Sequence, residues 1–170
     1  QATVIAERAL AATLPSVRVG VTEHELAAEL LAQMLRAGSG AELPFAPIVA
    51  AGPNSALPHA AVTERKLQAG DLLLFDWGAA SQGYASDLTR TFAVGAVEAE
   101  LKKVYAIVQA ANAAAQAAAR PGVTCASIDA AARQVIVAAG YGAFFTHRVG
   151  HGLGLEGHEA PSLHGENQTL

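Results

Sequence analysis

Two neighbouring segments, residues 71–77 and 84–94, have the composition of paired β-strands and constrain the fold more than any other feature. Residues 71–77 (DLLLFDW) form an apolar run that predicts a strand buried on both faces. Residues 84–94 alternate in character and are rich in β-branched side chains, which is typical of a second strand. Gly78 and the stretch Ser81-Gln82-Gly83 lie between them and predict a hairpin turn. An antiparallel hairpin is therefore expected at the centre of the chain.

Helical patterns dominate both sides of this hairpin. Apolar and alanine-rich periodicity predicts four helices, over residues 1–14, 23–37, 98–119 and 127–139. Thr22 stands three residues before Glu25, the arrangement of a capping box at the start of the second helix. Short strands are expected over residues 45–51 and 141–147. The order of helices, hairpin, helices and strand favours an α+β fold over a parallel βαβ series.

Composition excludes several classes of protein. The chain has 52% hydrophobic and 15% charged residues, which excludes a disordered chain, and its 170 residues suffice for one domain. With 11 basic residues against 15 acidic ones and no basic block, a nucleic-acid partner is not expected. The single cysteine, Cys125, excludes a disulfide framework and a cysteine zinc module. No stretch is apolar enough to predict a membrane span, and a cytoplasmic location is expected.

Two aspartates in the hairpin suggest chemistry. Asp76 interrupts the apolar strand, and a turn at residues 80–83 would place it directly opposite Asp87, with the Cβ atoms about 5 Å apart. Like charges in that position repel, so either a shared proton or a divalent cation is needed to offset them. The alternative is that both carboxylates lie at the sheet margin and form ordinary hydrogen bonds.

Four histidines add to this hypothesis. His59, His147, His151 and His158 lie in loop-like segments. His151 is flanked by glycines (GHGLG), whose missing side chains leave the backbone open to close approach. Carboxylates combined with imidazoles favour a divalent metal such as manganese, cobalt or zinc.

Four motifs in order resemble a known family. They are residues 48–59 (IVAAGPNSALPH), 76–78 (DWG), 84–92 (YASDLTRTF) and 147–161 (HRVGHGLGLEGHEAP). This pattern resembles the catalytic domain of Xaa-Pro peptidases, namely aminopeptidase P and Xaa-Pro dipeptidase (prolidase). The resemblance implies the pita-bread fold, an α+β architecture with a curved, mostly antiparallel sheet covered by helices. Residues 1–170 would form a single catalytic domain that lacks the last strands and any N-terminal domain.

The resemblance also implies roles for individual residues. Asp76, Asp87 and His151 match metal ligands, with Asp87 bridging two divalent ions, manganese first and zinc or cobalt as alternatives. His59, His147 and His158 match residues that bind substrate or stabilise the transition state. The two remaining ligands of the family are glutamates on strands beyond the histidine segment. Glu159 and Glu166 do not stand in the matching places.

The implied activity is hydrolysis of the Xaa-Pro bond in dipeptides or at the N-terminus of peptides. A hydroxide held between two metal ions would attack the carbonyl before proline. The expected partners are a peptide with proline at its second position, the C-terminal remainder of the same protein, and a second copy, since dimers are common in the family. Two alternatives stay open: a methionine aminopeptidase-type enzyme of the same fold and a non-catalytic binding module.

Overall fold

The computed structural model describes residues 1–170, which form two compact units. The first unit comprises Gln1–Glu98 and Leu153–Gly157, and the second comprises Ala99–Gly152 and His158–Leu170. Each unit combines helices with antiparallel strands, which confirms the predicted α+β class. None of the helices combines the length and apolar character needed to cross a membrane. The two units are described separately below.

Two helices begin the first unit. Helix α1 (Ala2–Thr13) continues into a 3-10 helix, η1 (Leu14–Ser16), and α2 (Glu23–Arg36) follows. The predicted capping box of α2 is confirmed. The Thr22 hydroxyl accepts a hydrogen bond from the Glu25 amide at 3.0 Å, and the Glu25 carboxylate accepts one from the Thr22 amide at 2.8 Å. Because this box satisfies orphan amides of the first turn, it fixes the start of α2.

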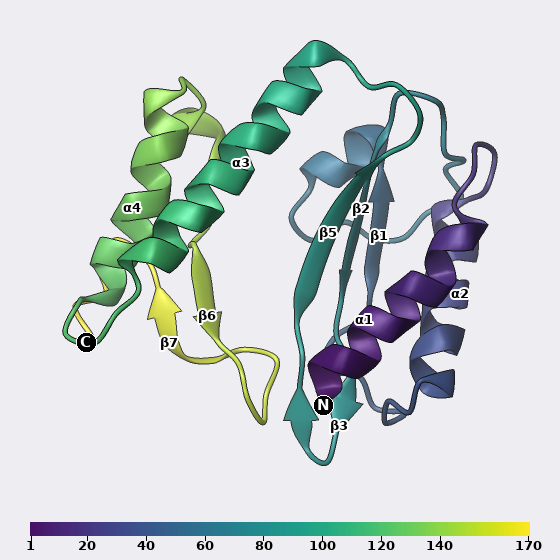
Figure 1. Ribbon diagram of the computed structural model, residues 1–170, viewed down its shortest axis with the longest axis horizontal. Helices are drawn as coiled ribbons and strands as arrows, with labels where there is room; N and C mark the ends of the chain where they lie inside the picture. Colours follow the sequence, from purple (N-terminus) through teal and green to yellow (C-terminus); the bar gives the residue numbers. More distant parts are fainter. The chain divides into compact units, whose positions relative to one another are not determined.

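The sheet of the first unit has the strand order β1-β2-β5 and is antiparallel throughout (Figure 1). Its strands are β1 (Ile48–Ala51), β2 (Leu72–Trp77) and β5 (Leu88–Ala93). In β2, the side chains of Leu73, Phe75 and Trp77 are fully buried and form one core with α1 and α2. The alternate residues of β2 are only half-buried, so the prediction of a strand buried on both faces is wrong. Helices α1 and α2 cover one face, which produces the period-two burial of an antiparallel strand.

A two-residue turn closes the hairpin between β2 and β5. The short strands β3 (Ala80–Ser81) and β4 (Tyr84–Ala85) pair across Gln82 and Gly83, both of which have positive φ angles, 53° and 83°. This is the conformation of a type I′ turn, whose twist matches that of paired strands.

The register that follows from this turn corrects one prediction. Asp76 pairs with Thr89, so it does not lie directly opposite Asp87 as predicted. The turn is centred one residue later than expected, which moves the pairing by two residues. Because side chains alternate with period two, a shift of two keeps Asp76 and Asp87 on the same face of the sheet. The aspartates are therefore diagonal neighbours.

The second unit is built on two packed helices, α3 (Ala99–Ala118) and α4 (Cys125–Ala138), seen side by side in Figure 1. Their contact is made by Ala111, Ala115, Ala132 and Ile136. Helix α4 begins two residues earlier than predicted because Thr124 caps it, its hydroxyl accepting from the Ser127 amide at 3.2 Å. The buried Cys125 occupies the first turn.

The rest of the second unit is a 3-10 helix, η3 (Gly142–Phe144), and a hairpin of β6 (Gly150–Gly152) and β7 (Glu159–Leu163). The strand predicted over residues 141–147 is therefore wrong. This segment has no neighbouring strand, and Arg133 of α4 instead donates hydrogen bonds to the carbonyls of Phe145 and His147. Side-chain donors thus take the place of a sheet partner.

Candidate functional site

Asp76 is the most unusual ionisable residue of the first unit. Its Oδ1 atom is buried and has no hydrogen-bond partner. Burial, and next the negative charge of Asp87, raise the pKa of Asp76 to about 6, although the Thr89 side chain and the charge of His59 act in the opposite direction. An orphaned carboxylate oxygen beside a second carboxylate fits a divalent cation, which supplies the missing partner and the missing positive charge.

Asp87 is positioned by an irregularity in the hairpin. The preceding residue, Ser86, is buried, and its hydroxyl accepts a hydrogen bond from the Ala79 amide at 2.9 Å, where a backbone carbonyl would normally accept. The two arms of the hairpin approach closely here, since a Cβ atom on Gly78 would lie 1.9 Å from the Ser86 carbonyl oxygen. Glycine at position 78 is therefore required for this approach, which brings Asp87 next to the end of β2.

His59 lies on an exposed loop that follows the 3-10 helix η2 (Gly52–Ala56). Its charge lowers the pKa of Asp76, so the first unit brings His59 into electrostatic reach of the aspartates. Sequence reasoning placed His59 in this segment but found nothing that holds the segment in place.

The loop of His59 is anchored by a residue that sequence reasoning missed. Glu23, in the first turn of α2, has no exposed surface. Its carboxylate accepts hydrogen bonds from the Ala51 amide at 2.7 Å, the Asn54 side chain at 3.0 Å, and the amide and hydroxyl of Thr63. Since Ala51 precedes the loop and Thr63 follows it, a single buried carboxylate ties both ends of the segment that carries His59.

His151 and His158 lie together in the second unit. Their ring centroids are 4.0 Å apart, and the rings are tilted by 35°. The Nδ1 atom of His151 is 2.9 Å from the carbonyl oxygen of Gly152. A carbonyl can only accept, so Nδ1 carries the proton and the ring lone pair lies on Nε2. Metal-bound histidines commonly have this arrangement, in which the second ring nitrogen donates to a carbonyl.

His147, also in the second unit, is exposed. Its Nδ1 atom lies 2.8 Å from the Arg148 carbonyl oxygen, and the edge of the Phe145 ring contacts its imidazole at a centroid distance of 4.7 Å. By the same argument as for His151, the Nδ1 atom carries the proton.

The predicted residues thus fall into two groups, Asp76, Asp87 and His59 in the first unit and His147, His151 and His158 in the second. No cluster of three or more His, Cys, Asp or Glu side chains has an arrangement that could hold a metal ion. Of the individual pairs, the structure brings together Asp76 with Asp87, and His151 with His158.

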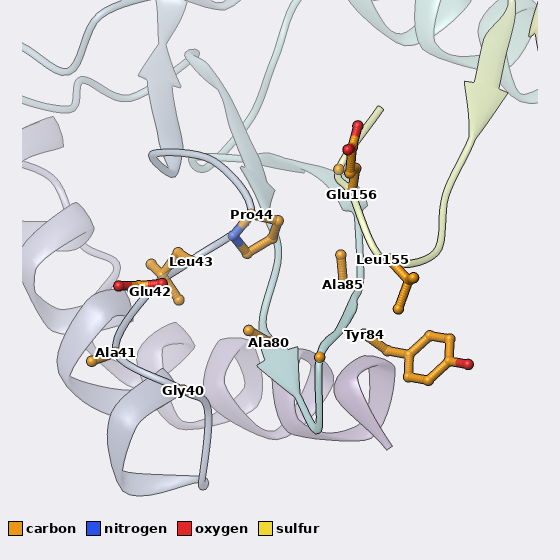
Figure 2. Close-up of a pocket in the computed structure, with 12 residues that line it drawn as sticks. Gly40, Ala41, Glu42, Leu43, Pro44, Ala80, Tyr84, Ala85, Leu155 and Glu156 are labelled. Carbon is orange, nitrogen blue, oxygen red and sulfur yellow. The ribbon is translucent and has the colours of Figure 1, made fainter. Parts of the chain in front are cut away.

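A cavity of about 670 Å³ also opens in the first unit (Figure 2). It is lined by residues 40–44, Ala80, residues 83–85 and residues 155–157. Residues 83–85 at the tip of the hairpin and residues 155–157 both line it. The Ala85 amide donates a hydrogen bond to the Gly154 carbonyl at 2.8 Å. None of the six predicted site residues lines this cavity.

Comparisons with known proteins identify the family and the relatives that this chain resembles. The sequence model of metallopeptidase family M24 matches residues 1–170. The chain is 40% identical over 167 residues to a Xaa-Pro dipeptidase of Pyrococcus horikoshii, covering 98% of this chain and 47% of that protein. It is 39% identical over 155 residues to a Xaa-Pro dipeptidase of Lactobacillus delbrueckii, covering 91% of this chain and 42% of that protein. The chain therefore spans about half the length of the curated relatives it matches.

Solved structures agree on the fold. The X-Pro aminopeptidase of Thermotoga maritima superposes with a TM-score of 0.96 at 40% identity, covering 99% of this chain and 48% of that one. The prolidase of Pyrococcus furiosus gives a TM-score of 0.95 at 38% identity, covering 99% of this chain and 50% of that one. The predicted pita-bread fold is thereby confirmed. On the match of its whole length, this chain belongs to metallopeptidase family M24.

Proposed function

We propose that the protein hydrolyses the Xaa-Pro bond of dipeptides or of peptide N-termini, using divalent metal ions. The observation that carries the proposal is the buried Oδ1 of Asp76, which has no hydrogen-bond partner and lies beside a second carboxylate. Two carboxylates placed in this way repel each other unless a proton or a cation lies between them, and a cation also supplies a partner for the orphaned oxygen. The names of the relatives supply the substrate class.

Asp76, Asp87 and His151 are the metal ligands in this proposal, with manganese the expected ion and zinc or cobalt the alternatives. The two carboxylates supply negative charge, and His151 supplies the Nε2 lone pair that its Nδ1 hydrogen bond leaves on that atom. The bound metal would act as a Lewis acid and lower the pKa of water.

The remaining histidines act on the substrate through hydrogen bonding, proton transfer and charge. His158 donates a hydrogen bond to the oxygen that gains negative charge when the carbonyl before proline is attacked. His147, with its proton held on Nδ1, presents Nε2 as the atom that accepts or returns a proton. His59 contributes positive charge near the aspartates when it is protonated.

The test uses the full-length protein, stripped of metal with a chelator and then supplied with Mn²⁺. Ala-Pro, Ala-Pro-Ala, Met-Ala-Ala and Ala-Ala are offered separately. Metal-dependent cleavage of Ala-Pro supports a dipeptidase, and cleavage of Ala-Pro-Ala alone supports an aminopeptidase. Cleavage of Met-Ala-Ala in preference to both proline substrates, or cleavage of none, contradicts the proposal.

A matched pair of variants tests the site itself. Asp87→Asn should abolish both hydrolysis and metal content, measured by elemental analysis. Glu64→Gln removes a carboxylate from an exposed side chain of the same unit and should change neither. Full activity of Asp87→Asn would show that this aspartate is not a ligand.

A further inference from the structure

An ion pair on α4, between the buried Asp129 and the half-buried Arg133, reaches from the helix to the segment of His147. Asp129, whose side chain is 1% exposed, binds the Arg133 guanidinium with two parallel hydrogen bonds, Nε to Oδ2 at 2.8 Å and Nη2 to Oδ1 at 2.9 Å. This fork fixes the plane of the guanidinium group, which a lysine ammonium could not do.

The pair continues into the backbone of residues 145–149. Arg133 Nη1 donates to the Phe145 carbonyl at 2.9 Å, and Nη2 donates to the His147 carbonyl at 3.0 Å. Asp129 Oδ1 accepts from the Val149 amide at 3.3 Å. The contacts fall on residues 145, 147 and 149, so the ion pair holds three points of the segment that joins η3 to β6. An ion pair that only supported its own helix would need none of them.

Ring packing extends the same set of contacts to the imidazole. The guanidinium carbon of Arg133 lies 4.4 Å from the centroid of the Phe145 ring, on its face. The Phe145 ring in turn meets the His147 ring edge-on, at 4.7 Å and an interplanar angle of 77°. The backbone and the ring plane of His147 are thus both set by residues that contact Arg133.

We propose that Asp129 and Arg133 are positioning residues. By holding the backbone on both sides of Arg148, they orient the imidazole of His147 toward the Arg148 carbonyl oxygen, 2.8 Å from Nδ1, and so keep its proton on Nδ1. The catalytic consequence rests on the proposed peptidase function, whereas the orientation itself does not. In full-length protein carrying ¹⁵N-labelled histidine, the ring-nitrogen shifts of His147 should report a single tautomer with Nδ1 protonated. Arg133→Lys keeps the charge but removes the fork, and it should give shifts averaged between tautomers.

Kinetics on an Xaa-Pro substrate give a second readout. Arg133→Lys should lower kcat/KM by about 10-fold, as for loss of a group that orients a functional histidine. In a His147→Ala background the same substitution should have no further effect, because Arg133 acts through His147. Additive losses in the double variant would overturn the proposal.

A matched control separates positioning from general stability. Arg65→Lys breaks an ion pair of the same bidentate kind, with Asp71 in the first unit at 2.7 and 2.9 Å. It should lower the melting temperature comparably and leave the His147 tautomer unchanged. If Arg133→Lys does not fold, the tautomer is measured in Phe145→Leu instead, because this variant keeps the Asp129–Arg133 pair and removes the ring contact.

The outcomes distinguish this inference from the proposed function. Suppose that the wild-type protein is inactive and yet shows a single His147 tautomer that is lost in Arg133→Lys. That result contradicts the proposed peptidase function and supports the positioning role of Asp129 and Arg133. An active protein whose His147 signals are the same in wild type, Arg133→Lys and Phe145→Leu contradicts the positioning. A His147 signal that changes equally in Arg65→Lys also contradicts it.

Discussion

Asp76 and Asp87 lie on the same face of the β2–β5 pair, where the charge of Asp87 adds to the effect of burial and raises the pKa of Asp76 to about 6. The ordinary pKa of an aspartate is about 3.9. Without a cation, the folded protein therefore holds the proton of Asp76 more tightly than the unfolded chain does.

The first prediction is a pH dependence of stability in metal-free protein. The pKa of Asp76 is higher in the folded protein than in the unfolded chain. The contribution of Asp76 to the free energy of unfolding is therefore fully present below about pH 4 and is lost as the pH rises through about 6. Two units of pKa correspond to about 3 kcal/mol. Asp76→Asn should remove this loss, so that the variant is the more stable protein at pH 7.5 and the two converge at pH 4.

Thermal unfolding in EDTA measures this difference across the pH range. Added Mn²⁺ should stabilise the wild type and leave Asp76→Asn unchanged, which reverses their order at pH 7.5. Parallel pH curves for the two proteins in EDTA would show that Asp76 does not titrate as described.

The second prediction concerns Glu23. Glu23→Gln replaces one carboxylate oxygen by an NH₂ group that faces the Thr63 amide, so that donors bonded to the buried carboxylate lose their acceptor. The expected loss of unfolding free energy is about 2–4 kcal/mol. Urea denaturation measures it, and hydrogen exchange should show faster opening of residues 51–63. Glu25→Gln, in the same helical turn but at the cap, should cost about 1 kcal/mol or less.

The third prediction concerns Gly78. An added methyl group would meet the Ser86 carbonyl oxygen at 1.9 Å, so Gly78→Ala must separate β2 from the Ser86 backbone. The expected destabilisation is about 2 kcal/mol or more, measured by thermal unfolding. Gly150→Ala is the control, because nothing lies within 4 Å of its Cβ position and its φ is not in the left-handed region. Equal melting temperatures for the two variants would contradict the close approach.

The fourth prediction separates two neighbouring histidines. His151→Ala in the full-length protein should lose bound metal, whereas His158→Ala should keep it and lower kcat by about 100-fold, as for loss of one oxyanion partner. Elemental analysis and initial-rate assays measure the two effects. The reverse pattern would exchange the roles proposed for these residues.

Local signals in the sequence predicted the helices well. The capping box of Thr22 and Glu25 and the glycine after residue 139 act within a few residues, so they are visible without tertiary structure. The start of α4 has a local signal of the same kind, since Thr124 stands three residues before Ser127 and caps the helix.

The register and the buried anchors were harder to predict. Moving the turn by one residue changes the partner of Asp76 from Asp87 to Thr89. Both aspartates stay on the same face of the sheet in either register, so composition alone does not distinguish the two registers. Glu23 and Asp129 resemble ordinary surface carboxylates of a helix. Their partners lie in other segments of the chain, and no local pattern reveals such contacts.

The two-residue turn at Gln82 and Gly83 has a consequence for the order of folding. It makes the pairing of β2 with β5 a contact between near neighbours in sequence, and such hairpins close within about 1–10 μs. The pairing of β1 with β2 needs a longer loop to close and is slower to form. Repulsion between Asp76 and Asp87 therefore acts on a local β-pairing of the chain, and we expect a proton on Asp76 to favour closure of this hairpin.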